Sequence, residues 1–205
     1  MKIFLHKCNI CPENHFICLA DPYRSWYNEM DEAKKLRCDR IKAPIDRILS
    51  ISGDHLARLA LEELTGSPAE KFHFSYDSHN KPILPDGSAY FNISHSGSYA
   101  VAIAAEKPCG IDIEVPRKIC TSVIDRVCTA EEKEFIENSP NKALAFLTVW
   151  TKKEAYFKSI GCGIATVLSF FNTLCEPKIV TLQTNDYVLS LYPQEKKEDI
   201  HVITK

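Results

Sequence analysis

A short segment near the middle of the chain alternates strictly between apolar and acidic side chains. In Ile-Asp-Ile-Glu-Val, residues 111–115, the apolar residues alternate with Asp112 and Glu114. Successive side chains of a strand point to opposite faces, so the pattern predicts a strand with one apolar and one acidic face. The two carboxylates would then lie about 6.6 Å apart on the same side. The fold must contain a sheet that buries at least one face of this strand.

The size and charge of the chain argue against several classes of protein. It has 205 residues, a formal net charge of −2 and nine cysteines. No block of like charges supports a broad nucleic-acid or membrane footprint, and no apolar run approaches the ~20 residues of a membrane helix. The apolar start is too short for a signal peptide, so we expect a cytoplasmic protein, whose length favours a monomer. Its thiols should then be free, including those of Cys8-x-x-Cys11.

Helix signals occur throughout the chain. The predicted helices cover residues 31–40, 46–64, 129–138 and 139–160. The first has acids early and bases late, and the second has an apolar stripe that ends at Gly66. The third opens with the capping box Thr129-x-x-Glu132. The fourth is expected to open with Ser139-Pro140 and to end before Gly161.

Strand signals alternate with these helices. The predicted strands cover residues 1–5, 16–20, 71–76, 90–93, 99–105, 110–115, 168–174, 179–183, 187–192 and 200–203. Residues 79–82 form a predicted turn in which Asn80 can adopt a left-handed conformation, and residues 94–98 form a predicted hairpin loop. Residues 98–103 resemble residues 186–191, which suggests two similar halves.

Two pairs of residues could carry chemistry through their spacing. Asp112 and Glu114 could hold Mg²⁺, which takes one or two protein carboxylates. A solvated strand face is the more common explanation of that spacing. Glu154 and Lys158 are four residues apart on one face of a predicted helix and could meet a phosphate and its metal. A surface ion pair is again the more common explanation.

A third group of candidates suits phosphate binding. Ser94 and His95 are neighbours on a strand end and point to opposite sides, which argues against a hydrolase pair. A hydroxyl, an imidazole and nearby backbone N–H groups suit a phosphate better. Five basic residues lie close to turns or helix ends, although a solvated surface position is the default for each one. They are Lys34, Arg37, Arg40, Arg47 and Lys81.

Four motifs follow one another along the chain. They are Asn80-Lys81-Pro82, Phe91-Asn92-Ile93-Ser94-His95-Ser96-Gly97, Gly110-Ile111-Asp112-Ile113-Glu114 and Trp150-Thr151-Lys152-Lys153-Glu154-Ala155-Tyr156-Phe157-Lys158. Together they resemble the motifs of the surfactin-synthetase-activating type of 4′-phosphopantetheinyl transferase. The resemblance covers about residues 31–165. Asn80 stands where the family usually has Gly, and the C-terminal part is shorter than usual.

The resemblance implies a fold. The family has an α+β fold of two similar α/β halves related by a pseudo-twofold axis, with the active site in the cleft between them. The N-terminal half, residues 1–105, would bind the phosphates of coenzyme A. The C-terminal half, residues 106–205, would carry the metal site and the Trp-Thr-Lys-Lys-Glu helix.

The resemblance also implies ligands and site residues. Mg²⁺ is the expected metal, with Mn²⁺ as a substitute, and coenzyme A is the expected co-substrate. The implied metal ligands are Asp112, Glu114 and Glu154. The implied catalytic residues are Glu154, Lys158 and Asp112. The implied coenzyme A-binding residues are Lys34, Arg37, Arg47, Lys81, Ser94, His95 and Lys158.

The implied reaction moves the 4′-phosphopantetheine group from coenzyme A to a serine of an apo acyl or peptidyl carrier protein and releases adenosine 3′,5′-bisphosphate. Glu154 or a water molecule on the metal would remove the serine proton. The pathway stays open among fatty-acid, polyketide and nonribosomal-peptide synthesis. Residues Arg117–Arg126 are either a carrier-docking site or an ordinary connecting loop.

Two other classes fit parts of the pattern. A magnesium-dependent nuclease or phosphohydrolase could use the same three carboxylates, and it would cleave phosphodiesters without coenzyme A. A scaffold protein that keeps the fold could bind coenzyme A without turnover. The complete set Asp112, Glu114, Glu154 and Lys158 favours the transferase over both.

Overall fold

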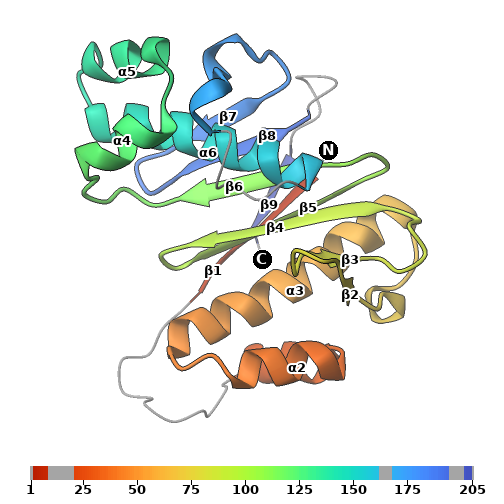
Figure 1. The fold of residues 1–205 in the computed structure, drawn as a ribbon. Helices are drawn as coiled ribbons and strands as arrows, with labels where there is room; N and C mark the ends of the chain where they lie inside the picture. The colour runs from red at the N-terminus through yellow and green to blue at the C-terminus, as the bar shows by residue number, and fades with distance from the viewer. Residues whose placement is uncertain (1, 9–20, 162–167, 194–200, 205) are drawn as a thin grey trace. The chain divides into compact units, whose positions relative to one another are not determined.

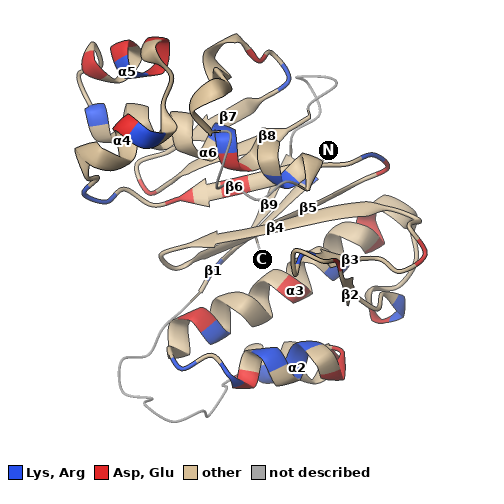
Figure 2. Ribbon diagram, in the orientation of Figure 1, with Lys and Arg blue, Asp and Glu red and all other residues tan. Residues whose placement is uncertain are grey.

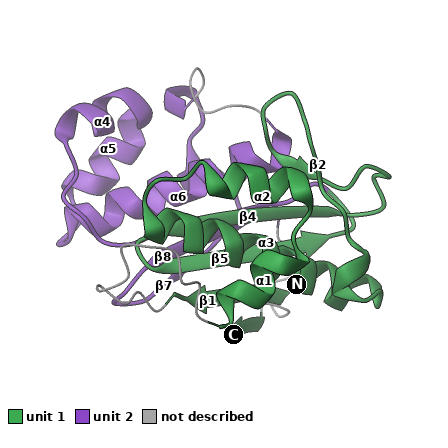
Figure 3. Cartoon of the chain, turned by 90° about the horizontal axis from the view of Figure 1, so that it is seen from below, with its two compact units in different colours: residues 1–107, 200–205 green, residues 108–199 purple. Residues whose placement is uncertain are grey.

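Each of two units of the chain has a sheet with a long helix packed on it. The computed structural model describes residues 2–8, 21–161, 168–193 and 201–204. Residues 1–107 and 200–205 form unit 1, and residues 108–199 form unit 2 (Figure 3). The mixture of helices and sheets is the α+β composition expected from the sequence.

Unit 1 contains a four-stranded sheet in the order β4-β5-β1-β9 (Figure 1). Its strands are β1 (Lys2–Lys7), β4 (Tyr90–Ser96), β5 (Tyr99–Ala105) and β9 (His201–Thr204). Strand β5 pairs antiparallel with β1 and β4, whereas β9 runs parallel to β1. The smaller elements are α1 (Tyr23–Glu29), α2 (Glu32–Asp39), the 3₁₀ helix η1 (Ala69–Lys71), β2 (Ser75–Tyr76) and β3 (Pro82–Ile83).

The core of unit 1 lies between this sheet and helix α3 (Pro44–Thr65). Leu56 and Leu61 of the helix pack with Phe4, Phe91 and other buried apolar side chains. Because burial of such side chains is the main driving force for folding, this layer holds the unit together. Helix α3 ends at Gly66, whose φ of 74° gives the left-handed cap that the sequence predicts.

A buried arginine joins the start of α2 to α3. The Arg58 guanidinium, 1% exposed, donates to Asp54 on α3 at 2.8 Å and to Asp31 at 3.1 Å. Asp31 precedes α2, and its carboxylate also accepts the backbone N–H of Phe74 at 3.0 Å. The network therefore holds α2 beside the segment that leads into β2.

Unit 2 contains a three-stranded antiparallel sheet in the order β6-β8-β7. Its strands are β6 (Gly110–Glu114), β7 (Val180–Gln183) and β8 (Val188–Tyr192). Its helices are α4 (Thr121–Val127), α5 (Ala130–Glu137), α6 (Lys142–Ile160) and the 3₁₀ helices η3 (Leu168–Phe170) and η4 (Thr173–Cys175). Helix α6 packs on β6 and β8, and α5 packs on α6.

Gly110 sets how closely α6 approaches β6. A Cβ atom at this position would overlap the backbone carbonyl of Ala155 and lie 2.8 Å from the backbone nitrogen of Ser159. Only a residue without a side chain leaves room for this backbone contact. Side chains two residues apart share a strand face, so Asp112 and Glu114 lie on the face that α6 covers.

Several predicted elements are confirmed. The capping box of α5 is present, with Glu132 N donating to Thr129 Oγ1 and Thr129 N donating to Glu132. Gly161, at a φ of 69°, ends α6, and Asn80 has a φ of 63°. Each of the six cysteines within the described ranges is a free thiol, whereas Cys11 lies outside those ranges.

Other predicted elements are wrong. The expected loop 94–98 is shorter, because Ser96 pairs with Tyr99 and β4 continues through Ser94 and His95. Helix α6 starts at Lys142 rather than after Ser139, because the Asn141 side chain accepts the Leu144 N–H and forms the N-cap.

Two further segments depart from the expected strands. Residues 168–174 form 3₁₀ helices, and of residues 71–76 only the last two are a strand. Phe72, Phe74 and Leu168 pack into the cores without a strand partner, which a local pattern does not reveal. Predicted strand 16–20 lies outside the described residues. Within the described ranges, no helix has the length and apolar composition to cross a membrane.

The substitution Gly110→Ala tests the close packing of α6 on β6. We expect the free energy of unfolding to fall by about 2–3 kcal/mol, because the added methyl group forces strand and helix apart. Urea denaturation of the purified variant measures this loss. The control is Gly66→Asn, where a Cβ meets open space and Asn tolerates the positive φ; it should lose less than about 1 kcal/mol. Equal losses in both variants would contradict the packing argument.

Candidate active site

Strand β6 is buried on both faces. Asp112 is 5% exposed, nearly as buried as the apolar residues Ile111 and Ile113 beside it. The Glu114 side chain is 14% exposed. The acidic face is therefore not a solvated strand face, which was the alternative explanation of the sequence pattern. Carboxylates that are taken out of water need a counter-charge or a hydrogen-bond partner.

Helix α6 supplies both a charge of the opposite sign and a third carboxylate. The Lys158 ammonium lies 2.6 Å from Asp112 Oδ1 and donates to the Ile111 carbonyl at 3.3 Å. Glu154, one turn earlier on the same face of the helix, is 5% exposed. The structure thus brings the predicted residues of β6 and α6 together in unit 2.

The carboxylates of this cluster interact electrostatically. Burial, the negative charge of Asp112 and, to a smaller extent, that of Glu114 together raise the pKa of Glu154 to about 7, against the opposing effect of Lys158. Three carboxylates near one ammonium leave an excess of negative charge. Such a donor set suits a hard divalent cation, which binds oxygen ligands and offsets their mutual repulsion.

The cluster as it stands is not arranged as a metal site. Among the described residues, no group of three or more His, Cys, Asp or Glu side chains is placed so that it could hold a metal ion. The Lys158 ammonium takes the position beside Asp112 that a cation would need. The chemistry of the donor set fits Mg²⁺, but binding would require Lys158 to give up its contact with Asp112.

The predicted docking segment after β6 is partly helical. Arg117 donates to Glu114 at 3.2 Å and keeps 60% of its side chain exposed. The apolar residues Ile119, Val123 and Ile124 pack against the core of unit 2. The basic residues Arg117, Lys118 and Arg126 are exposed and are accessible to a partner.

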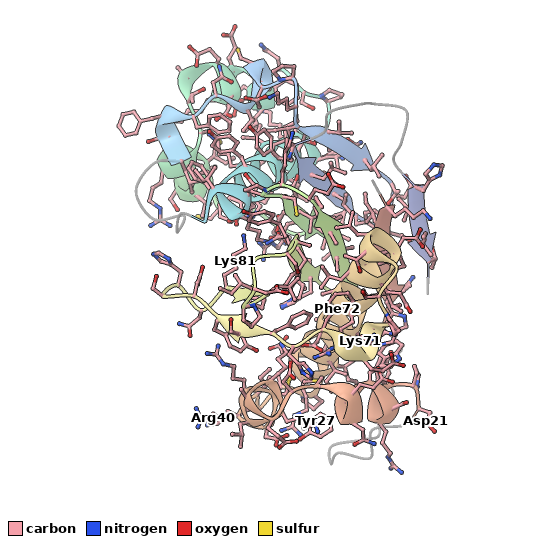
Figure 4. The ribbon with its side chains drawn as sticks, turned by 90° about the vertical axis from the view of Figure 1, so that its right-hand side faces the viewer. Asp21, Tyr27, Arg40, Lys71, Phe72 and Lys81 are labelled. Atoms are coloured by element: carbon pink, nitrogen blue, oxygen red, sulfur yellow. The ribbon has the colours of Figure 1, made fainter. Side chains whose placement is uncertain are left out.

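In unit 1, helix α2 and the turn before β3 bring basic groups together. Figure 2 shows that Lys and Arg predominate along α2. The Arg37 guanidinium lies 3.6 Å from the ring centre of Tyr76 and donates to Asn80 Oδ1 at 3.1 Å. Lys81, labelled in Figure 4, follows Asn80 in the same turn. This arrangement holds a planar cation beside an aromatic ring, which is a common way to bind phosphate.

Two other predicted phosphate ligands make contacts within the protein. Lys34 donates to Ser50 Oγ at 2.9 Å. Arg47 donates to the carbonyls of Cys38 and Asp39 at 3.0 and 2.8 Å, so it caps the C-terminal end of α2. A basic side chain at this end is favourable because the last carbonyls of a helix lack partners.

Ser94 and His95 lie on β4. Ser94 is buried, with 6% exposure, and His95 is exposed. They point to opposite faces of the sheet, as the sequence argument expects for neighbours on a strand.

Two residues that shape the candidate sites, Tyr76 and Gly110, were not predicted from the sequence. Tyr76 is the ring on which Arg37 stacks, and Gly110 sets the spacing between β6 and α6. An aromatic residue just before a predicted turn was a weak signal for the first. A glycine that begins a strand was a signal of close backbone approach for the second.

Residues 20–203 match two known family profiles. The profile of the 4′-phosphopantetheinyl transferase superfamily matches residues 108–203, and that of the 4′-phosphopantetheinyl transferase N-terminal region matches residues 20–107. The chain belongs to the 4′-phosphopantetheinyl transferase family, and the prediction of a transferase enzyme is confirmed.

The relatives identify the type within the family. The 4′-phosphopantetheinyl transferase psf-1 of Bacillus pumilus is 31% identical over 158 residues, which are 75% of this chain and 68% of the relative. The corresponding gsp protein of Aneurinibacillus migulanus is 28% identical over 77% of this chain and 63% of its own. Sfp of Bacillus subtilis strain 168 is 28% identical over 68% of this chain and 63% of its own. The surfactin-synthetase-activating type is therefore confirmed, with about two thirds of each relative covered.

The pH dependence of stability tests the environment of Glu154. Its pKa is about 7 in the folded chain against an ordinary value of 4.5, so the folded state holds the proton more tightly. The corresponding stability is present below about pH 4.5 and is lost as the pH rises through 7. In EDTA above pH 7, Glu154→Gln should therefore be more stable than the wild type by up to about 3 kcal/mol. Urea denaturation from pH 4.5 to 8 measures the difference, and a constant difference across that range would disprove the raised pKa.

Proposed function

We propose that this chain transfers the 4′-phosphopantetheine group of coenzyme A to a serine of an apo acyl or peptidyl carrier protein, with Mg²⁺, and releases adenosine 3′,5′-bisphosphate. The observation that carries the proposal is the buried cluster of Asp112, Glu154 and Lys158 on β6 and α6. It lies in the part of the chain that matches the transferase superfamily. The expectation of a pseudo-twofold axis and of an active site in a cleft between two halves stays a prediction.

The reaction forms one phosphorus–oxygen bond and breaks another. The serine oxygen attacks the β-phosphorus of coenzyme A, and the bond from that phosphorus to the bridging oxygen breaks. The electron pair leaves with adenosine 3′,5′-bisphosphate. Glu154 is the proposed acceptor of the serine proton, since a carboxylate whose pKa is near 7 is suited to general base catalysis at neutral pH.

The other residues of the cluster would offset the negative charge of the pyrophosphate, directly or through the metal ion. Lys158 would exchange its contact with Asp112 for a pyrophosphate oxygen and stabilise the negative charge that develops there. Asp112, Glu114 and Glu154 are the proposed ligands of Mg²⁺, which would neutralise part of the pyrophosphate charge when bound.

Unit 1 would bind the phosphates of coenzyme A. Arg37, Lys81 and His95 are the proposed contacts with the most support, because Arg37 stacks on Tyr76 and donates to Asn80, Lys81 follows Asn80 in the turn, and His95 is an exposed residue of β4. Lys34 and Ser94 are further proposed contacts. Arg47 can take part only if it releases the carbonyls at the end of α2.

The partner and setting are also proposals. The exposed basic side chains of residues 117–126 would attract a carrier protein of opposite charge, because complementary charge speeds association. We propose a cytoplasmic monomer without nucleic-acid or membrane partners. A phosphodiesterase and a coenzyme A-binding scaffold are the alternatives that a transfer assay separates.

Mass spectrometry of an apo acyl carrier protein tests the proposed reaction. After incubation with the enzyme, coenzyme A and Mg²⁺, we expect the carrier to gain the mass of one phosphopantetheine group. The gain should disappear in EDTA, because the buried carboxylates then lack their cation. If several unrelated apo carriers stay unmodified while coenzyme A binds, the scaffold alternative holds.

Single substitutions separate the roles of the two units. Asp112→Asn should lower kcat by ~100-fold or more, because it removes a proposed ligand of the Mg²⁺ that would neutralise the pyrophosphate charge. The matched control is Glu137→Gln, an exposed carboxylate in unit 2 that pairs with Lys142. Lys81→Ala should raise the Kd for coenzyme A about tenfold with little loss of kcat, as calorimetry and saturating kinetics would show. Full activity of Asp112→Asn would remove the site assignment.

A further inference from the structure

A buried ion pair lies next to Glu154 on helix α6. The Lys153 ammonium is 2.8 Å from Glu132 Oε2, and both side chains are fully buried, with 0% exposure. Long charged side chains are almost never fully buried unless they are paired. The proposed reaction uses neither residue directly, so the pair needs another explanation.

Lys153 has a partner for each of its three donor hydrogens. It donates to the Leu168 carbonyl at 2.6 Å and to the Phe171 carbonyl by a short contact, besides its bond to Glu132. An ammonium has three N–H donors and no acceptor, so its hydrogen-bonding capacity is filled. Lys153 thereby ties α6 to the segment that contains η3.

Glu132 is equally engaged. Its Oε1 accepts the backbone N–H and the hydroxyl of Thr173, each at 2.8 Å, and its Oε2 accepts the Thr129 N–H at 2.9 Å. Glu132 therefore belongs to the capping box of α5, is the counter-ion of Lys153 on α6, and binds Thr173 of η4. One buried pair connects four elements of unit 2.

The geometry of α6 makes this pair relevant to Glu154. Successive residues of an α-helix are rotated by about 100°, so Lys153 faces α5 and η3 while Glu154 faces β6. The contact of Gly110 with Ala155 holds the helix from the strand side. Contacts on both sides fix the rotation of α6 about its axis, and that rotation decides whether Glu154 and Lys158 reach Asp112.

Stability alone does not require the pair. Replacing a buried ion pair by apolar residues of similar volume is often neutral or stabilising, because desolvation offsets the attraction. Directional hydrogen bonds to three carbonyl and carboxylate oxygens, by contrast, allow one orientation of the helix. Reaction rates depend steeply on such placement, since a misplacement of about 1 Å can cost ~100-fold.

We propose that Glu132 and Lys153 are positioning residues for the phosphopantetheinyl transfer: they hold α6 so that Glu154 and Lys158 face Asp112. The inference rests on the proposed function. It assigns to the pair a role in kcat, not in the binding of coenzyme A, since Glu132 and Lys153 bind each other and groups of α5, η3 and η4 within unit 2.

The test is a double variant, E132Q/K153M, which removes both charges and keeps similar volumes. We expect a folded protein by circular dichroism, a kcat for apo acyl carrier protein lowered at least tenfold, and a KM for coenzyme A within twofold of the wild type. The matched control is Lys152→Met, the preceding lysine of α6. It should keep wild-type kcat and KM.

A milder variant keeps the test decisive if the double variant does not fold. Thr173→Val keeps the shape of a fully buried residue and removes one hydrogen bond to Glu132. It should lower kcat severalfold with unchanged KM. If folded variants keep kcat within twofold of an active wild type, or if Lys152→Met loses as much, the positioning role is wrong. If the wild type transfers nothing to any apo carrier, the proposed function fails and the inference fails with it.

Discussion

The close packing of α6 on the acidic face of β6 is the contact on which the candidate site depends. A side chain at Gly110 would separate the two elements, and its absence lets the helix backbone touch the strand. Helix α6 then covers carboxylates that would otherwise be solvated. Burial and charge repulsion follow from this one contact, and both raise the pKa of Glu154.

The same contact explains why the cluster is rich in negative charge yet stable. Lys158 pairs with Asp112 and offsets part of the repulsion among the carboxylates. Lys153, on another side of the helix, is paired with Glu132. Two lysines five residues apart therefore have different tasks. In the proposed reaction, Lys158 exchanges its contact with Asp112 for one with a substrate phosphate. Lys153, by contrast, is held by the backbone carbonyls of Leu168 and Phe171.

Much of the site could be predicted from local pattern. The alternation around Asp112 predicted the strand, and the four-residue spacing of Glu154 and Lys158 predicted a shared helix face. Prediction failed where long-range contacts decided the structure. Residues 168–174 form 3₁₀ turns whose backbone binds Lys153 and Glu132, and Arg47 of α3 caps the C-terminal end of α2.

The sequence by itself determined the family, the candidate site residues and the order of the main helices and strands, because these depend on motifs and on short periodicities. Only the tertiary structure decided which face of β6 is covered, that β9 pairs parallel with β1, and that a buried pair spans α5, α6 and the 3₁₀ helices. Those outcomes depend on contacts between residues far apart in the chain, and a local pattern carries no information about its distant partner.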